Sequence, residues 1–139
     1  MKSSKIAFLI IGIIISTTLF TTLAFYIKNN RISPNNKEIT VLAIINYGTL
    51  IPENQEEYSV SISNGSTALE VFAKVADLDL LNYSFGVYIR GVNGYTEQSP
   101  HYWAFYYYNH DSQMWVYSEV GVHGYYTVQN DRIKLQYTG

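Results

Sequence analysis

The chain has 139 residues, of which 47% are hydrophobic, 16% aromatic and 14% charged, with 14 Tyr and no Cys. This length predicts one small domain with one core and argues against a two-domain enzyme. The absence of Cys excludes a disulfide scaffold, a Cys-ligated zinc site and a thiol nucleophile. From residue 29 onward, six Lys and Arg stand against 11 Asp and Glu, a net charge near −5. Because these six cations are scattered along the sequence, we expect no nucleic-acid partner.

The N-terminal segment is a long apolar run. Residues 6–27 carry no charged side chain, and a helix of that length, at about 1.5 Å per residue, crosses a hydrocarbon core of roughly 30 Å. Tyr26 beside Lys28 is typical of a membrane interface, and the run is longer than that of a signal peptide. We therefore expect residues 1–28 to be a retained membrane anchor. Cleavage of a signal near Ala24 is the alternative interpretation.

The orientation of this span is not decided by its flanking cations, because Lys and Arg lie on both sides of it. The acidic, Tyr-rich remainder favours the outside of the cell. Two glycosylation sequons, at Asn64 and Asn82, are compatible with that location. The sequence thus predicts a single-pass membrane protein with an extracellular C-terminal domain, or a secreted protein if the signal is cleaved.

Residues 29–38 are polar and include Pro34 among several Asn, which predicts a short linker before a domain over 39–139. The run Glu38–Tyr47 is rich in β-branched apolar residues and predicts a central strand buried on both faces. Residues 58–63 alternate strictly between apolar or aromatic side chains and Ser. They predict a half-buried strand that pairs with the first.

A helix is predicted over residues 67–77. Asn64-Gly65 breaks the preceding strand, and Thr67 and Glu70 have the spacing of a capping box. The apolar positions recur at intervals of three and four residues, which gives one stripe to lay across a sheet: Ala68, Val71, Phe72 and Val75.

Strand patterns separated by turn-forming residues follow the helix. The predicted strands are Tyr83–Arg90, His101–Asn109, Trp115–Ser118, Tyr125–Val128 and Arg132–Tyr137. A hairpin, one helix and several further strands predict an α+β domain: a β-grasp-like mixed sheet with one amphipathic helix, preceded by an N-terminal transmembrane helix.

Four segments, taken in order, resemble a domain of unknown function that is similar to the C-terminal domain of transcobalamin and intrinsic factor. They are Gly65–Val71 (GSTALEV), Tyr88–Val92 (YIRGV), Tyr102–Asn109 (YWAFYYYN) and Asn130–Ile133 (NDRI), and the likeness spans about residues 39–138. The sequence departs from the family pattern at His110 and Asn130, which replace turn glycines. Asn and His tolerate positive φ better than most residues, so the fold is little endangered.

The resemblance implies a binding role. In the cobalamin carriers this domain covers one face of the corrin, while a separate helical-barrel domain holds the other. Residues 39–138 correspond to the domain that covers one face of the corrin, without the helical-barrel domain. We therefore expect them to offer half a pocket. Tight cobalamin capture is then expected to need a partner chain.

Catalytic chemistry finds no support in the sequence. His101, His110 and His123 show no metal-ligand spacing, and the loop over residues 109–113 predicts a hairpin turn rather than a calcium site. Nucleophile-elbow, Walker and dinucleotide patterns are absent. We expect no enzyme, no catalytic residue, no metal site and no cofactor; cobalamin enters only as a candidate ligand.

The aromatic run over residues 101–109 exceeds what a small core needs, so one of its faces is expected to be exposed. Stabilising Tyr ladders explain the run equally well. If a small molecule binds, the aromatic rings supply stacking and apolar area, while an arginine and an asparagine supply polar ends. The predicted ligand-binding residues are Trp103, Tyr88, Arg90, Phe105, Tyr107 and Asn109.

These observations favour a membrane-anchored extracellular binding module whose ligand is a corrinoid or a glycan. The alternative is a structural surface, filament or adhesion subunit secreted by an N-terminal signal. In that case strand edges pair between copies, and a partner protein or self-association replaces the small ligand.

Overall fold

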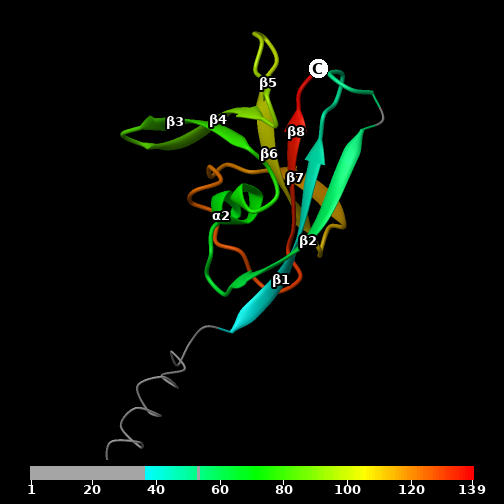
Figure 1. The fold of residues 1–139 in the computed structure, drawn as a ribbon. Helices are drawn as coiled ribbons and strands as arrows, with labels where there is room; N and C mark the ends of the chain where they lie inside the picture. Colours follow the sequence, from blue (N-terminus) through cyan, green and yellow to red (C-terminus); the bar gives the residue numbers. More distant parts are fainter. Residues whose placement is uncertain (1–36, 53) are drawn as a thin grey trace, which may run out of the picture. The chain divides into compact units, whose positions relative to one another are not determined.

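The computed structural model describes residues 37–52 and 54–139, which belong to one compact unit (Figure 1). The predicted anchor and most of the predicted linker lie outside the described residues. No helix within the described residues has the length and apolar character needed to cross a membrane. The elements are β1 (Glu38–Asn46), β2 (Gln55–Ser63), α2 (Ala68–Ala73), β3 (Leu78–Tyr83), β4 (Gly86–Val92), β5 (Tyr95–Thr96), β6 (Trp103–Asn109), β7 (Met114–Tyr117) and β8 (Arg132–Tyr137).

Five strands form a mixed sheet in the order β2-β1-β8-β6-β7. β1 and β8 run parallel at its centre, and the other neighbouring pairs are antiparallel. The predicted strand over residues 58–63 does pair with the first strand, and its apolar side chains face inward while its Ser side chains are exposed. Within the described residues, the prediction of a mixed sheet with one amphipathic helix is confirmed in part, because the structure also contains a second sheet.

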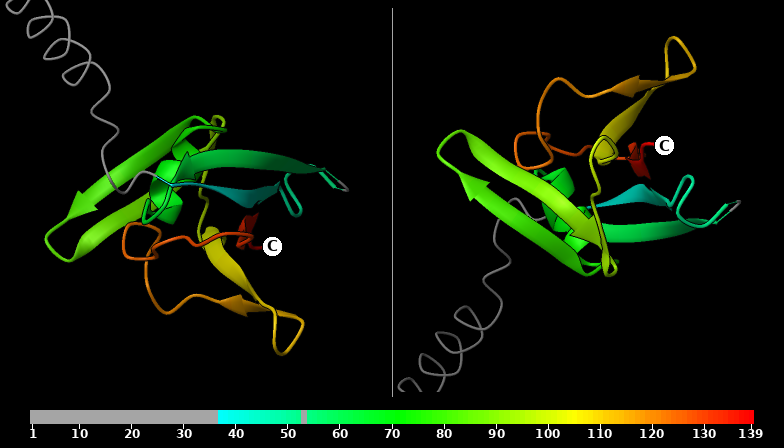
Figure 2. Two further views of the ribbon diagram at one scale, coloured as in Figure 1. Left: turned by 90° about the horizontal axis from the view of Figure 1, so that it is seen from below. Right: turned by 90° about the horizontal axis from the view of Figure 1, so that it is seen from above.

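The core lies on one face of this sheet. Helix α2 and the β3–β4 hairpin are on the same side of the five strands (Figure 2). Phe72 of α2 is fully buried and meets the ring of Phe105 edge to face, with centroids 6.2 Å apart. Burial of one such ring stabilises the fold by about 2–3 kcal/mol. The apolar stripe of the helix is thus the contact that fixes it on the sheet.

Helix α2 is shorter than the sequence predicts. The capping box between Thr67 and Glu70 is present, but the helix ends at Ala73 instead of residue 77. The Asp77 N–H donates to Asn93 Oδ1 at 2.8 Å, and the Asn93 N–H donates to the Asp77 carbonyl at 2.7 Å. This tertiary contact occupies the backbone groups that a longer helix would use.

The prediction of one strand over Tyr83–Arg90 is wrong. Residues 78–92 form a hairpin, β3 and β4, which with β5 makes a second, three-stranded sheet that the sequence analysis did not predict. Phe85 lies at the hairpin tip, 83% exposed, and stacks on Tyr83. Gly86 has φ +148°, a conformation that favours glycine and that turns the chain here.

The predicted strand Tyr125–Val128 is also absent as a strand. Tyr126 makes an isolated bridge to Thr67, and this segment bonds instead to the start of α2. The Ala68 N–H donates to the Tyr125 carbonyl at 2.8 Å, and the Thr127 N–H donates to the Ser66 carbonyl at 2.8 Å. The backbone groups that a strand would offer to a sheet are used to hold the helix.

Candidate functional site

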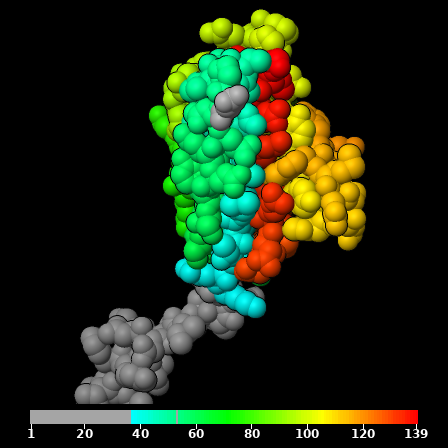
Figure 3. Space-filling view, turned by 90° about the vertical axis from the view of Figure 1, so that its right-hand side faces the viewer, coloured from blue at the N-terminus to red at the C-terminus, as the bar shows by residue number. Residues whose placement is uncertain are grey.

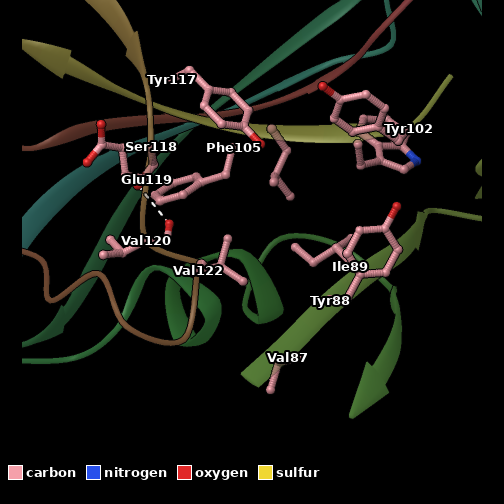
Figure 4. A pocket seen from close by; sticks show the side chains of 13 residues that line it. Val87, Tyr88, Ile89, Tyr102, Phe105, Tyr117, Ser118, Glu119, Val120 and Val122 are labelled. Atoms are coloured by element: carbon pink, nitrogen blue, oxygen red, sulfur yellow. Dashed lines mark hydrogen bonds between the residues drawn. The ribbon is translucent and has the colours of Figure 1, made fainter. Parts of the chain in front are cut away.

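A pocket of about 210 Å³ opens where β4 and β6 face the segment that follows β7 (Figure 4). Its lining comes from four separate parts of the chain, residues 87–89, residues 102–105, residues 117–122 and Leu135 of β8. The lining residues are Val87, Tyr88, Ile89, Tyr102, Trp103, Phe105, Tyr117, Ser118, Glu119, Val120, Gly121, Val122 and Leu135. The pocket therefore exists only because the second sheet packs against the first.

Trp103 and Phe105 contribute to the apolar part of this pocket. Trp103 is 4% exposed, and its Nε1–H donates to the Tyr95 carbonyl at 2.8 Å. Its indole also meets the rings of Tyr47 and Tyr137 edge to face, with centroids 5.8 and 5.4 Å apart. A side chain held on so many sides is a rigid surface for a ligand rather than a mobile contact.

The accessible part of the lining is amphipathic. Tyr102 and Tyr117 are 40% and 54% exposed, and Val120, which also lines the pocket, is half exposed. The Ser118 hydroxyl donates to the Val120 carbonyl at 2.8 Å, which holds the segment after β7 in its bend (Figure 4). Phenol hydroxyls next to apolar surface suit a ligand that has both ring faces and hydroxyl or amide groups.

A second, more open pocket of about 420 Å³ adjoins the first, because Tyr88 and Tyr102 line both. Glu97 and His101 belong to this outer part. The Tyr88 hydroxyl donates to the Glu97 carboxylate. Burial, and then the hydrogen bond to Glu97, raise the pKa of Tyr88 above its ordinary value, so this phenol remains neutral at physiological pH.

The structure brings three of the six predicted ligand-binding residues together. Tyr88, Trp103 and Phe105 line the pocket. The other three lie outside its lining, where each has a partner of its own. Arg90 pairs with Asp79 at 2.7 Å, Tyr107 packs on Tyr125 with centroids 5.6 Å apart, and Asn109 Oδ1 accepts the N–H groups of Asp111 and Ser112.

The sequence analysis missed the third wall, residues 117–122. Most of these residues lie between two predicted strands, in a glycine-containing loop that shows no periodic pattern. Two apolar residues within this loop, Val120 and Val122, were the sequence feature that could have indicated contact with the rest of the domain. Val122 is buried, whereas Val120 is half exposed at the pocket.

Within the described residues, no group of three or more His, Cys, Asp or Glu side chains is placed to hold a metal ion. His110 stands at the β6–β7 turn against Tyr108. His123 accepts the Val87 N–H at its Nδ1, at 3.3 Å, and so joins the second sheet to the loop after β7. These two imidazoles have packing roles that the structure shows directly.

Comparisons with known proteins support the fold. No family model matches the chain, and no curated protein matches it in sequence. Among solved structures, haptocorrin in complex with Cbi is similar over 74% of this chain and 25% of haptocorrin, with a TM-score of 0.61 and 16% identity. A protein from Ruminococcus gnavus described as a candidate metal-binding protein is similar over 73% of this chain and 97% of its own, with a TM-score of 0.56 and 11% identity.

The chain thus spans a quarter of haptocorrin, and identities of 16% and 11% establish a shared fold alone. The fold that the sequence resemblance implied is confirmed by the likeness to haptocorrin. This domain shares its fold with one part of haptocorrin.

Proposed function

We propose that residues 39–139 form a non-catalytic module that binds a small ring-bearing molecule in the pocket between β4, β6 and the segment after β7. The observation that carries this proposal is the convergence of a rigid Trp103 and accessible Tyr102 and Tyr117 on one cavity. Concave aromatic surface with a few polar groups is the usual character of a ligand site. The likeness to haptocorrin, solved with Cbi, supports the same role.

A corrinoid is the first ligand to test, and a glycan is the second. The volume of about 210 Å³ is below the range of roughly 300–1,000 Å³ typical of sites that enclose a whole drug-sized ligand. The pocket therefore takes one ring or one substituent and leaves the rest of a corrin uncovered. We expect a dissociation constant on the order of micromolar or weaker, about 8 kcal/mol at most, unless a partner chain covers the other face.

Calorimetry on the fragment 29–139 against cobalamin, cobinamide and a glycan panel tests the proposal, since residues 36–139 form a compact unit with its own core. Tyr102→Ala removes an accessible ring and Val120→Trp fills the opening; each is expected to weaken binding at least about tenfold. Tyr126→Ala is the matched control, because this Tyr is 68% exposed and does not line the pocket.

Loss of binding in both pocket variants, with the control unchanged, supports the site. Equal weakening in the control contradicts it, as does binding that neither pocket variant affects. Circular dichroism at increasing temperature shows whether each variant remains folded. Trp103→Ala is less useful, because the loss of a buried Trp costs about 3–5 kcal/mol of stability.

We further propose that the protein is held at the membrane by residues 6–27, with residues 39–139 outside the cell. The support is the uncharged apolar run and the acidic remainder of the chain. Membrane fractionation of the full chain is expected to place it in the membrane pellet, and mass spectrometry is expected to find a peptide that begins near Met1. A mature N-terminus near Ala24 supports secretion instead, and an intact chain in the soluble cytoplasmic fraction contradicts both.

A structural role is the second candidate. Strand β2 is nine residues long and forms an edge of the five-stranded sheet, so its outer backbone groups are open to another strand. The exposed carboxylate of Glu57 places a negative charge on this strand and opposes its pairing with a second copy. Concentration-dependent association in sedimentation, abolished by a Pro at exposed Ser59, favours this role over ligand binding.

A further inference from the structure

The face of the five-stranded sheet opposite α2 carries a group of cations and aromatic rings. Arg132 and Lys134 alternate with buried Ile133 and Leu135 along β8, so both point to this face. Figure 3 looks onto it and shows the strands side by side, with β8 in red beside the yellow and orange of β6 and β7. We name the residues gathered there the cation–aromatic cluster: Tyr106, Tyr108, Trp115, Arg132 and Lys134.

Strand register brings the rings of this cluster against the cations. The Arg132 guanidinium carbon lies 4.4 Å from the centroid of Tyr108 and 5.5 Å from that of Trp115. Lys134 Nζ lies 5.0 Å from Tyr106 and 4.7 Å from Trp115. Trp115 therefore stands between two positive charges. Such contacts orient the cations and compensate their charge only in part.

Within residues 37–52 and 54–139, neither cation has a carboxylate partner. Among the residues that the structure describes, the side-chain ion pair is that of Arg90 with Asp79, and Arg132 Nε is a buried donor without an acceptor. Glu57 belongs to the same face, but its neighbour in register, Ile44, separates it from Lys134. Burial lowers the pKa of Lys134, as expected for an ammonium group that has lost water and gained no anion.

We propose that the cation–aromatic cluster is a binding site for a sugar that carries an oxyanion, a sulfate, phosphate or carboxylate group. The anion bridges Arg132 and Lys134, which are about 7 Å apart along the strand, and the ring of the sugar rests on the exposed parts of the Tyr and Trp rings. Arginine and lysine next to each other provide directional and point-charge recognition of such an anion. This site is distinct from the pocket lined by Trp103.

The charge of the domain favours a short ligand over a long polyanion. Residues 37–139 contain five Lys and Arg and 11 Asp and Glu. Because the domain has a net negative charge, it repels an extended polyanion such as a nucleic acid or a sulfated polysaccharide. A sugar of one or two rings stays within the cluster.

Fluorescence titration of the full chain in neutral detergent tests the proposal with sucrose octasulfate and sucrose as a matched pair. The chain has two Trp, of which Trp103 is buried in the core, so Trp115 is the reporter and Trp115→Phe identifies its signal. We expect sucrose octasulfate to bind and sucrose not to bind. The double variant Arg132→Gln/Lys134→Gln is expected to weaken binding at least about tenfold.

The control is Lys37→Gln/Lys74→Gln, which removes the same charge from two exposed positions and is expected to change affinity less than about twofold. Tyr108→Leu keeps both cations and is expected to weaken the sugar sulfate more than inorganic sulfate. Equal losses in the two double variants would falsify the site. A preference for inorganic sulfate, or tighter binding of a thymidine oligonucleotide than of sucrose octasulfate, overturns the assignment to a sugar.

Discussion

At the residue scale, Tyr125 shows how one buried phenol couples stability to pH. Its ring packs edge to face on Phe105, with centroids 5.4 Å apart, and burial together with the nearby charge of Asp131 raises its pKa to about 12. The folded state therefore keeps a proton that the unfolded chain loses above its ordinary pKa of 10.0. The resulting stabilisation is complete below pH 10 and is lost as the pH rises toward 12.

In the unmodified chain, the free energy of unfolding is expected to fall between about pH 9 and about pH 11. Replacing Tyr125 by Phe is expected to make this fall smaller by roughly 1 kcal/mol. Guanidinium denaturation at a series of pH values measures this change. Tyr126→Phe, at a ring in solvent, is the control and should leave the alkaline loss as in the unmodified chain. An unchanged alkaline loss in Tyr125→Phe contradicts the assignment.

At the element scale, the β3–β4 hairpin approaches the loop after β7 closely at Gly86. A Cβ at Gly86 would overlap the ring of His123, whose Nδ1 accepts the Val87 N–H. Gly86→Ala is expected to lower the unfolding free energy by roughly 2–4 kcal/mol, through backbone strain and displacement of the imidazole.

The matched control for Gly86→Ala is Gly65→Ala. Gly65 has φ +86° and open space around it, so substitution there adds backbone strain alone, on the order of 1 kcal/mol. In the double variant Gly86→Ala/His123→Ala the imidazole is absent, so Gly86→Ala should lower the unfolding free energy less than it does in the unmodified chain. A double-mutant cycle measures this difference. If Gly86→Ala costs no more than Gly65→Ala, the steric explanation fails.

At the scale of the whole molecule, the sheet order and the candidate site depend on contacts between distant parts of the chain. The strands with clear alternation or apolar runs, such as Arg132–Tyr137, could be predicted closely, because burial of one face imposes the period. The turn at Ser84–Phe85 could not, since the aromatic residues on both sides of it also suit a continuous strand. Arg90 lies outside the pocket because this hairpin places it beside Asp79, whereas Tyr107 and Asn109 lie outside because β6 continues past the pocket toward its turn with β7.

Local patterns were enough to predict a mixed sheet, the capped amphipathic helix and the inward face of β2, because propensity, capping and periodicity can be read from neighbouring residues. Contacts between distant parts of the chain bury Trp103 in a pocket wall, complete that pocket with residues 117–122, and bring Arg132 and Lys134 to one face with three aromatic rings. These outcomes depend on which strands become neighbours and on where the second sheet packs. The strand order and the position of the second sheet depend on burial between residues far apart in the sequence, which a local pattern does not reveal.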